Sequence, residues 1–140
     1  MKNIMFTLCF LSLSLLSAQS EEQQLTEALN RYIQGSSYSL PKLIGSAFYE
    51  DATLFLSKKD QEIYALSPKE YAELFEKRER GKFNGRYGSI LAIDISNNIA
   101  TAKAEIHIPK GNMRFIDLFL LKKLQGEWKI IGKAATLMPE

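Results

Sequence analysis

The second half of the chain constrains the fold most, because its apolar residues recur with a period of two. From Tyr87 onward this pattern predicts four strands, over residues 87–96, 99–108, 112–124 and 127–135. Short turn signals separate the strands, namely Asn97-Asn98, Pro109-Lys-Gly111 and Gln125-Gly126. Because connections this tight join antiparallel neighbours, we expect a four-stranded meander.

The first half carries helical patterns instead. Apolar residues recur there at three- and four-residue spacing: Leu25, Ala28, Leu29, Tyr32 and Ile33. The stripe predicts an amphipathic helix that ends at Gly35, with Tyr32 facing inward. A second short helix is expected with Pro41 in its first turn, followed by a strand over residues 52–56 that Asp51 opens.

A capping-box pattern marks a third helix. In Ser67-Pro-Lys-Glu70 the serine hydroxyl can accept from the backbone of Glu70, and the glutamate can reach back. Tyr71, Leu74 and Phe75 are then expected to face inward. Helices in the first half and a meander in the second half predict an α+β fold, with three helices packed on a mainly antiparallel sheet.

The first twenty residues have the layout of a secretory signal peptide. Lys2 precedes an apolar run, and small residues follow near Ala18 and Ser20, after either of which cleavage is plausible. An uncleaved anchor is the alternative. We therefore expect a signal peptide over residues 1–20, one domain over residues 21–140, and an exported protein, periplasmic or secreted. The single cysteine, Cys9, lies in the leader, so the mature chain has no disulfide or cysteine metal site.

The charge of the expected mature chain is nearly balanced. Without Lys2 it has 17 Lys and Arg against 16 Asp and Glu, a net charge of +1. This balance favours neither nucleic acid nor an anionic membrane as a partner. The densest basic stretch, residues 77–86, has no aromatic stacking platform, and we interpret it as a solvated helix end and loop.

Asp117 interrupts the apolar stretch MRFIDLFLLK at residues 113–122. It shares one face of the predicted strand with Met113, Phe115, Phe119 and Leu121, and the other face is also apolar, which is typical of a central strand. An apolar setting favours a protonated acid that can donate a hydrogen bond to a ligand. The alternative is a structural role, in which Asp117 caps a backbone group or pairs with Arg31 or Lys133.

The chain resembles the nuclear transport factor 2-like superfamily, and within it the small bacterial proteins called "putative lumazine-binding". The resemblance covers residues 22–136. It rests on the order and spacing of four stretches: Asn30-Arg-Tyr32, Leu43 to Phe48 running into Asp51-Ala-Thr-Leu54, Phe115-Ile-Asp117, and Leu121 to Ile131. It implies a cone-shaped fold, in which a curved sheet wraps around the helices and leaves a hydrophobic pocket at its wide end, often in a homodimer.

Ketosteroid isomerases of that superfamily offer an expectation for the pocket. The resemblance places Tyr32 and Asp117 at their two hydrogen-bond donors, a tyrosine and a protonated aspartate. The position of their catalytic base falls on Leu56, which cannot take a proton. Half a site therefore remains, suited to a carbonyl or phenol oxygen in an apolar cavity.

We therefore expect a non-catalytic protein that binds a small apolar or aromatic ligand. The candidate ligand-binding residues are Tyr32, Phe48, Leu56, Phe75, Phe115, Asp117 and Phe119. One alternative is a polyketide cyclase-like or dehydratase-like lyase or isomerase, whose base would be an ionisable side chain facing Asp117. Another is a homodimeric assembly module without a ligand, joined through the polar face of residues 99–107.

The remaining polar residues predict no further chemistry. His107, the sole histidine, falls on a polar strand face, where an exposed or interface position is the expectation. Asp60 and Glu62 fall in a polar loop. No spacing of ligand residues predicts a metal site, and no glycine loop predicts a phosphate-bound cofactor.

Overall fold

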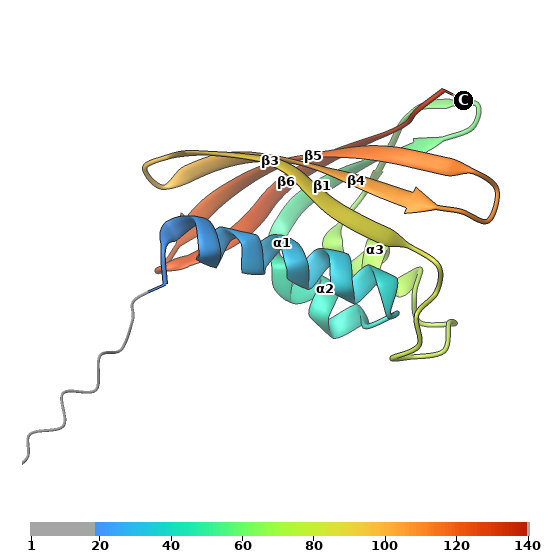
Figure 1. The fold of residues 1–140 in the computed structure, drawn as a ribbon, viewed down its shortest axis with the longest axis horizontal. Helices are drawn as coiled ribbons and strands as arrows, with labels where there is room; N and C mark the ends of the chain where they lie inside the picture. The colour runs from blue at the N-terminus through green and yellow to red at the C-terminus, as the bar shows by residue number, and fades with distance from the viewer. Residues whose placement is uncertain (1–18, 140) are drawn as a thin grey trace, which may run out of the picture.

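The computed structural model describes residues 19–139 and folds them into one curved sheet with helices on one side (Figure 1). Cys9 and all but the last two residues of the predicted signal peptide lie outside the described residues. The elements, in chain order, are α1 (Glu21–Ser37), α2 (Pro41–Ala47), β1 (Phe48–Lys58), β2 (Gln61–Leu66), α3 (Pro68–Glu73), β3 (Tyr87–Ser96), β4 (Ile99–Ile108), β5 (Met113–Leu124) and β6 (Glu127–Leu137). No helix in the described part is long and apolar enough to cross a membrane.

The strand order is β2-β1-β6-β5-β4-β3. The predicted meander from β3 to β6 is confirmed, and every pair in it is antiparallel. The last strand, β6, also pairs with β1, and that pair is parallel. β5 and β6 are therefore the two central strands, and the central position predicted for the strand that carries Asp117 is confirmed.

Helix α1 is longer than the sequence pattern predicts. Ser20 begins it with a capping box, in which its hydroxyl accepts from the backbone N–H of Gln23 at 3.2 Å. The helix does not end at Gly35 but continues to Ser37. Glycine is needed at position 35 for packing, because a Cβ there would lie 2.8 Å from the backbone nitrogen of Ile44. The absence of a side chain lets α2 pack closely against α1.

Other boundaries also differ from the predictions, and β1 spans Phe48–Lys58 where a strand over residues 52–56 was expected. The polar loop expected around Asp60 and Glu62 is a hairpin, in which Asp60 lies in the turn and Glu62 in β2. β2 is an exposed edge strand, so its sequence has no clean alternation to recognise. The capping box at Ser67 is confirmed, but α3 ends at Glu73. Tyr71 and Phe75 are buried as predicted, whereas Leu74, which was expected to face inward, is 51% exposed.

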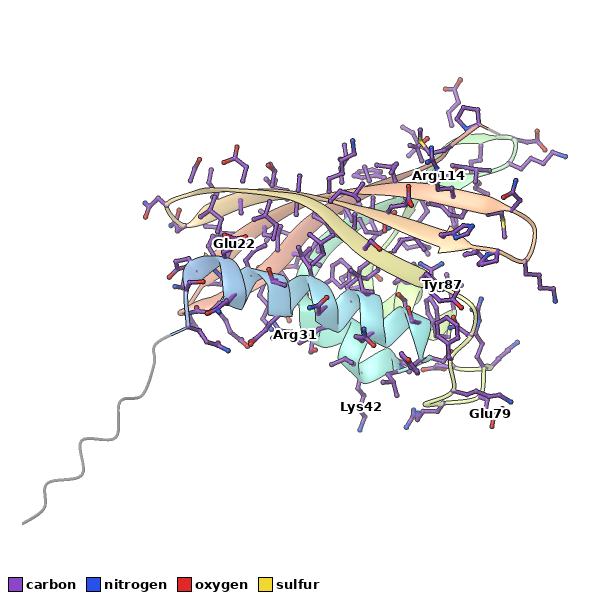
Figure 2. The ribbon with its side chains drawn as sticks, viewed as in Figure 1. Glu22, Arg31, Lys42, Glu79, Tyr87 and Arg114 are labelled. Carbon is purple, nitrogen blue, oxygen red and sulfur yellow. The ribbon has the colours of Figure 1, made fainter. Side chains whose placement is uncertain are left out.

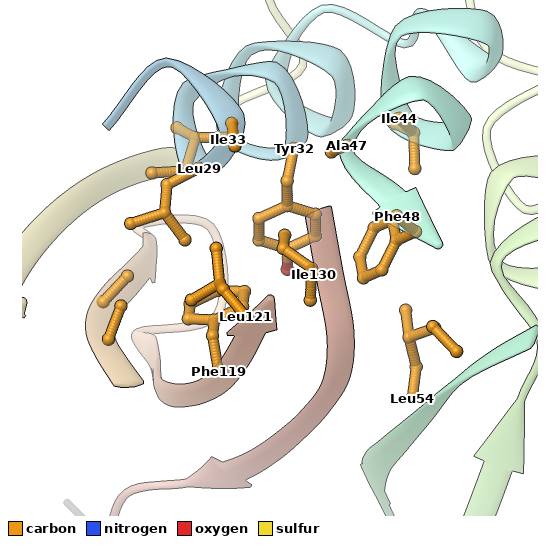
Figure 3. Packing of buried hydrophobic residues seen from close by; sticks show 14 of the residues in the cluster. Leu29, Tyr32, Ile33, Ile44, Ala47, Phe48, Leu54, Phe119, Leu121 and Ile130 are labelled. Atoms are coloured by element: carbon orange, nitrogen blue, oxygen red, sulfur yellow. The ribbon is translucent and has the colours of Figure 1, made fainter. Parts of the chain in front are cut away.

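The core lies between the helices and the concave face of the sheet (Figure 3). Small side chains on β4, Ala100, Ala102 and Ala104, leave space for larger groups from the helices. Tyr32 extends from α1 towards the strands, beside Phe119 and Ile130. The opposite face of the sheet has no helix over it in the described part of the chain. The second apolar face of β5 is consequently open, with Leu118 53% exposed and Leu120 47% exposed.

Candidate ligand-binding site

Asp117 is almost completely buried, with 2% of its surface exposed. Its Oδ2 accepts a hydrogen bond from the Tyr32 hydroxyl at 2.6 Å and another from the Lys133 ammonium at 3.0 Å. Both partners are also buried. Asp117 therefore belongs to a three-residue cluster contributed by α1, β5 and β6. The small side chain of Ala104, its neighbour on β4, leaves room beside the carboxylate.

This geometry differs from the expected pair of donors. Asp117 accepts a hydrogen bond from the Tyr32 hydroxyl instead of donating one to a ligand. Of the two cations expected as its structural partners, Lys133 makes the contact. Arg31, labelled on α1 in Figure 2, instead donates to the backbone oxygen of Trp128 at 3.4 Å.

Tyr32 is fixed in place by other aromatic rings. Its ring packs edge-on against Phe48 and Phe119, at 5.8 and 5.5 Å between centroids. Its hydroxyl oxygen lies 3.4 Å from that of Tyr71. Burial, together with the nearby Tyr71 and Asp117, raises the pKa of Tyr32 well above its ordinary value. Tyr32 therefore stays a neutral phenol and a hydrogen-bond donor at physiological pH.

Lys133 completes the cluster and also faces the two tyrosines. Its ammonium lies 5.3 Å from the ring centre of Tyr32 and 5.7 Å from that of Tyr71. Cation–π attraction adds to the ion pair at such distances. The ammonium is thus held by a carboxylate on one side and by two ring faces on another. Lys133 as a whole residue is 4% exposed.

Arg86 brings a second cation to the same place. It lies in the segment between α3 and β3, at the end of the basic stretch that we interpreted as solvated. Arg78, Arg80 and Lys82 are exposed as expected, but Arg86 is only partly exposed and its Nε is buried. Burial by itself lowers the pKa of Arg86, but nearby Tyr71, Tyr32 and Asp117 outweigh it and the pKa is raised. Arg86 is therefore a permanent cation.

These groups surround a cavity of about 130 Å³ between the helices and the sheet. Its lining comprises Tyr32, Leu56, Ser57, Tyr71, Arg86, Ile106, Phe115, Asp117, Lys133 and Ala135. Ser57 is exposed and marks the solvent side. The lining therefore combines apolar walls with one buried carboxylate and two cations.

The structure brings together four of the seven expected site residues. Tyr32, Leu56, Phe115 and Asp117 line the cavity. The other three, Phe48, Phe75 and Phe119, are buried in the core but are not part of the lining. The expected set lacked Ser57, Tyr71, Arg86, Ile106, Lys133 and Ala135. His107 is exposed on β4, away from this lining, as predicted.

A β-bulge explains why simple alternation does not place Lys133 in the lining. Trp128 and Ile130 are buried on β6, and a strict period of two would point residue 133 outward. The pairing register shifts between Leu120 and Leu121, which leaves Ile131 as an extra residue on β6. The shift turns Lys133 inward. Within residues 19–139, no three His, Cys, Asp or Glu side chains lie close enough to hold a metal ion.

Comparison with known proteins agrees with this architecture. A sequence family described as "Putative lumazine-binding" matches residues 20–134. A nuclear transport factor 2-like protein from Shewanella baltica, whose title gives its function as unknown, is 21% identical, with a TM-score of 0.74 over 88% of this chain and 100% of its own. A similar protein from Methylobacillus flagellatus is 29% identical, with a TM-score of 0.73 over 88% of this chain and 97% of its own.

A third solved structure is titled a ketosteroid isomerase-like protein, from Erwinia carotovora atroseptica. It is 14% identical, with a TM-score of 0.62 over 87% of this chain and 100% of its own. At this identity the likeness concerns the fold alone. No curated protein matches the chain.

Proposed function

Because the chain belongs to the family described as "Putative lumazine-binding", we propose that it binds a small ligand in the cavity between its helices and its sheet. The observation that carries the proposal is the position of the Asp117–Lys133 ion pair. Both side chains are 2% exposed, and both line the cavity instead of being enclosed by core side chains.

A buried ion pair is poorly explained by stability alone. Removing two charges from water costs several kcal/mol per ion, and hydrophobic replacement of such a pair is often neutral or stabilising. Here the pair stands beside Leu56, Ile106 and Phe115, in walls that would otherwise be apolar. Polar groups placed in this way fix the orientation of a ligand in a mostly apolar pocket.

The same groups argue for binding without catalysis. Leu56 lines the cavity, and the resemblance to ketosteroid isomerases assigns their catalytic base to this position. Two ionisable side chains, Tyr32 and Lys133, contact Asp117, and both already donate a hydrogen bond to that carboxylate. An ammonium has no lone pair with which to abstract a proton. We therefore place the lyase or isomerase alternative second.

Filling the cavity tests the proposal. Ala135→Leu puts three extra carbon atoms into the lining, whereas Ala92→Leu adds the same atoms to an exposed position on the outermost strand β3. A set of small aromatic and short aliphatic compounds would be screened by NMR line broadening and chemical-shift change. We expect compounds that bind the wild type and Ala92→Leu but not Ala135→Leu. Binding that is the same in both variants would place the ligand elsewhere.

We also propose that a second copy of the chain covers the open face of the sheet, as the family resemblance implies. Phe55, Ala134 and Leu118 are register partners across β1, β6 and β5 and form a continuous exposed strip. Sedimentation would compare Leu118→Lys with Leu91→Lys, an equally exposed leucine on the outermost strand β3. We expect the dimer to dissociate only in Leu118→Lys, and a monomeric wild type would end the proposal.

Export completes the proposed function, and it rests on the sequence of residues 1–20. The expectation is a mature protein in the periplasm or the medium. Cell fractionation of the full chain, beside a form without residues 2–18, would check it by intact mass. Retention of the full-length mass in the cytoplasm would contradict export.

A further inference from the structure

We infer that the ligand of this cavity carries a carboxylate, which the guanidinium of Arg86 binds. The inference rests on the proposed function, since it names the chemical class that the cavity takes. Three of the lining side chains are ionic, Asp117, Lys133 and Arg86, and their formal sum is one positive charge.

The excess positive charge belongs to Arg86. Asp117 is engaged by Lys133 at 3.0 Å and by Tyr32 at 2.6 Å. Among residues 19–139, no carboxylate lies within 4.0 Å of the Arg86 guanidinium. Its Nε is buried and has no hydrogen-bond partner in the same part of the chain. In the described part of the chain, the cavity therefore has a cation without a carboxylate at ion-pair distance, and one donor of that cation has no partner.

Arginine cannot relieve this imbalance by losing a proton. A buried lysine can become neutral, whereas the guanidinium stays charged in proteins. Leaving a charge unpaired at a buried position is unfavourable, so it needs a counter-ion or solvent on its cavity side. A carboxylate suits the planar guanidinium because its two oxygens can accept two parallel N–H hydrogen bonds.

The backbone of Arg86 is anchored independently of its charged end. The Ser37 hydroxyl donates to the Arg86 carbonyl oxygen at 2.8 Å, and the Arg86 N–H donates to Asn84 Oδ1 at 3.2 Å. Asn84 in turn donates to the Ser36 carbonyl oxygen at 2.6 Å. The segment before β3 is thus bound to the end of α1. These bonds position Arg86 and leave its guanidinium available.

The size of the cavity limits the rest of the ligand. An apolar cavity of about 150 Å³ holds a benzene molecule. The present cavity measures about 130 Å³ and has aromatic and aliphatic walls from Tyr71, Phe115 and Ile106. A compact monocarboxylate with a flat or short apolar body, of about the size of benzoate, fits these limits. Lys133, whose ammonium has three protons, can donate to the same carboxylate.

Benzoate and benzamide are suitable probes because they share a shape and differ in charge. Binding to the protein would be measured by isothermal titration and by NMR at fixed ionic strength. The variants are Arg86→Met and, as a matched control, Arg78→Met. Arg78 packs on the same Phe75 ring, 5.0 Å from its centre against 5.9 Å for Arg86, but does not line the cavity.

We expect the wild type and Arg78→Met to bind benzoate at least about tenfold more tightly than benzamide, and Arg86→Met to lose this preference. Equal binding of the two probes by the wild type, or a preference that survives in Arg86→Met, would overturn the carboxylate inference and leave the proposed function standing. If neither these probes nor any compound of the fragment screen binds in the cavity, both fail.

A second variant keeps the test valid if Arg86→Met does not fold. Arg86→Lys keeps the charge but loses the two-pronged geometry. We expect it to bind benzoate several-fold more weakly than the wild type, with benzamide binding unchanged. Unchanged benzoate affinity in a cooperatively folded Arg86→Lys would overturn the role of Arg86.

Discussion

Two clusters in this molecule use the same chemistry in different surroundings. At the start of α1, the Glu21 carboxylate accepts from Lys123 and from the indole N–H of Trp128. In the cavity, the Asp117 carboxylate accepts from Lys133 and from the hydroxyl of Tyr32. Each cluster joins α1 to the sheet through one carboxylate, one lysine and one aromatic donor.

The two clusters differ in exposure. The side chains of Glu21 and Lys123 are 50% and 25% exposed, whereas those of Asp117 and Lys133 are both 2% exposed. An exposed pair contributes little to stability and can be replaced at little cost. Both ions of a buried pair lose their hydration, and removing one of them is strongly destabilising because the other charge remains buried without a partner. Stability alone therefore explains the buried cluster poorly, and the ligand binding that we propose would give it a role.

Removing each carboxylate should produce the largest difference between the clusters. Asp117→Ala leaves the Lys133 ammonium buried without its counter-charge, so we expect the free energy of unfolding to fall by about 4 kcal/mol. Glu21→Ala leaves Lys123 in contact with water and should have a much smaller effect. Urea unfolding, with m-values to confirm a single transition, measures both. Equal losses would show that burial does not distinguish the clusters.

Removing both charges of the buried cluster is the next test. In Asp117→Leu combined with Lys133→Met, apolar side chains of similar size replace the pair. We expect the double variant to lie within about 1 kcal/mol of the wild type in stability, while losing ligand affinity. Restored stability with lost binding would assign the pair to function. A double variant as unstable as Asp117→Ala would assign it to the scaffold.

Alkaline pH should affect the buried cluster through Tyr32. Burial, Tyr71 and Asp117 raise the pKa of Tyr32. The folded state therefore keeps the phenol proton of Tyr32 at a pH, about 10, at which the unfolded chain releases it. The contribution of Tyr32 to stability is thus complete below about pH 10 and is lost as the pH rises further. Melting temperatures between about pH 9 and pH 11 should fall less steeply for Tyr32→Phe. Tyr87→Phe, which changes a tyrosine that is 56% exposed, is the control and should follow the wild type.

The smallest effect is expected from acid on the surface cluster. Hydrogen bonds from Lys123, and then from Trp128, lower the pKa of Glu21. Its contribution is present above the unfolded pKa of about 4.3 and is lost as the pH falls through the lower folded value. Glu21→Gln should flatten the acid side of the melting curve at low salt, and the difference should shrink at high salt. Glu127→Gln, which removes the exposed pair with Lys129, should change the curve less.

Local sequence patterns were sufficient for most of the fold. Alternation and turn residues predicted β3 to β6 to within a few residues, and the capping box located the start of α3. Asp117 was identified as the unusual residue because a lone acid in an apolar strand is visible without a structure. Patterns with a fixed period fail where the period changes. The bulge opposite Leu120 is such a place, and it hides the inward direction of Lys133.

The remaining site residues depend on contacts that are distant in the sequence. Arg86 ends a run of charged residues, and nothing local separates it from its exposed neighbours. Hydrogen bonds of its backbone with Ser37 and Asn84 fix its position. Phe75 and Phe119 were expected in the cavity as aromatic residues on inward faces, but both pack in the core. An inward face is predictable, whereas the boundary between filled and open space is not.

The position of β6 has a consequence for how the chain folds. β1 has β2 and β6 as its neighbours, and β6 is formed by residues 127–137. The β1–β2 hairpin and the hairpins from β3 to β5 can form from nearby residues, but the β1–β6 pair cannot form until residues 127–137 have been synthesised. Until then Phe48 and Leu54, which are both buried in the folded protein, lack their pairing partners on β6. A nascent chain that stops before residue 127 therefore holds two separate pieces of sheet and is exposed to aggregation.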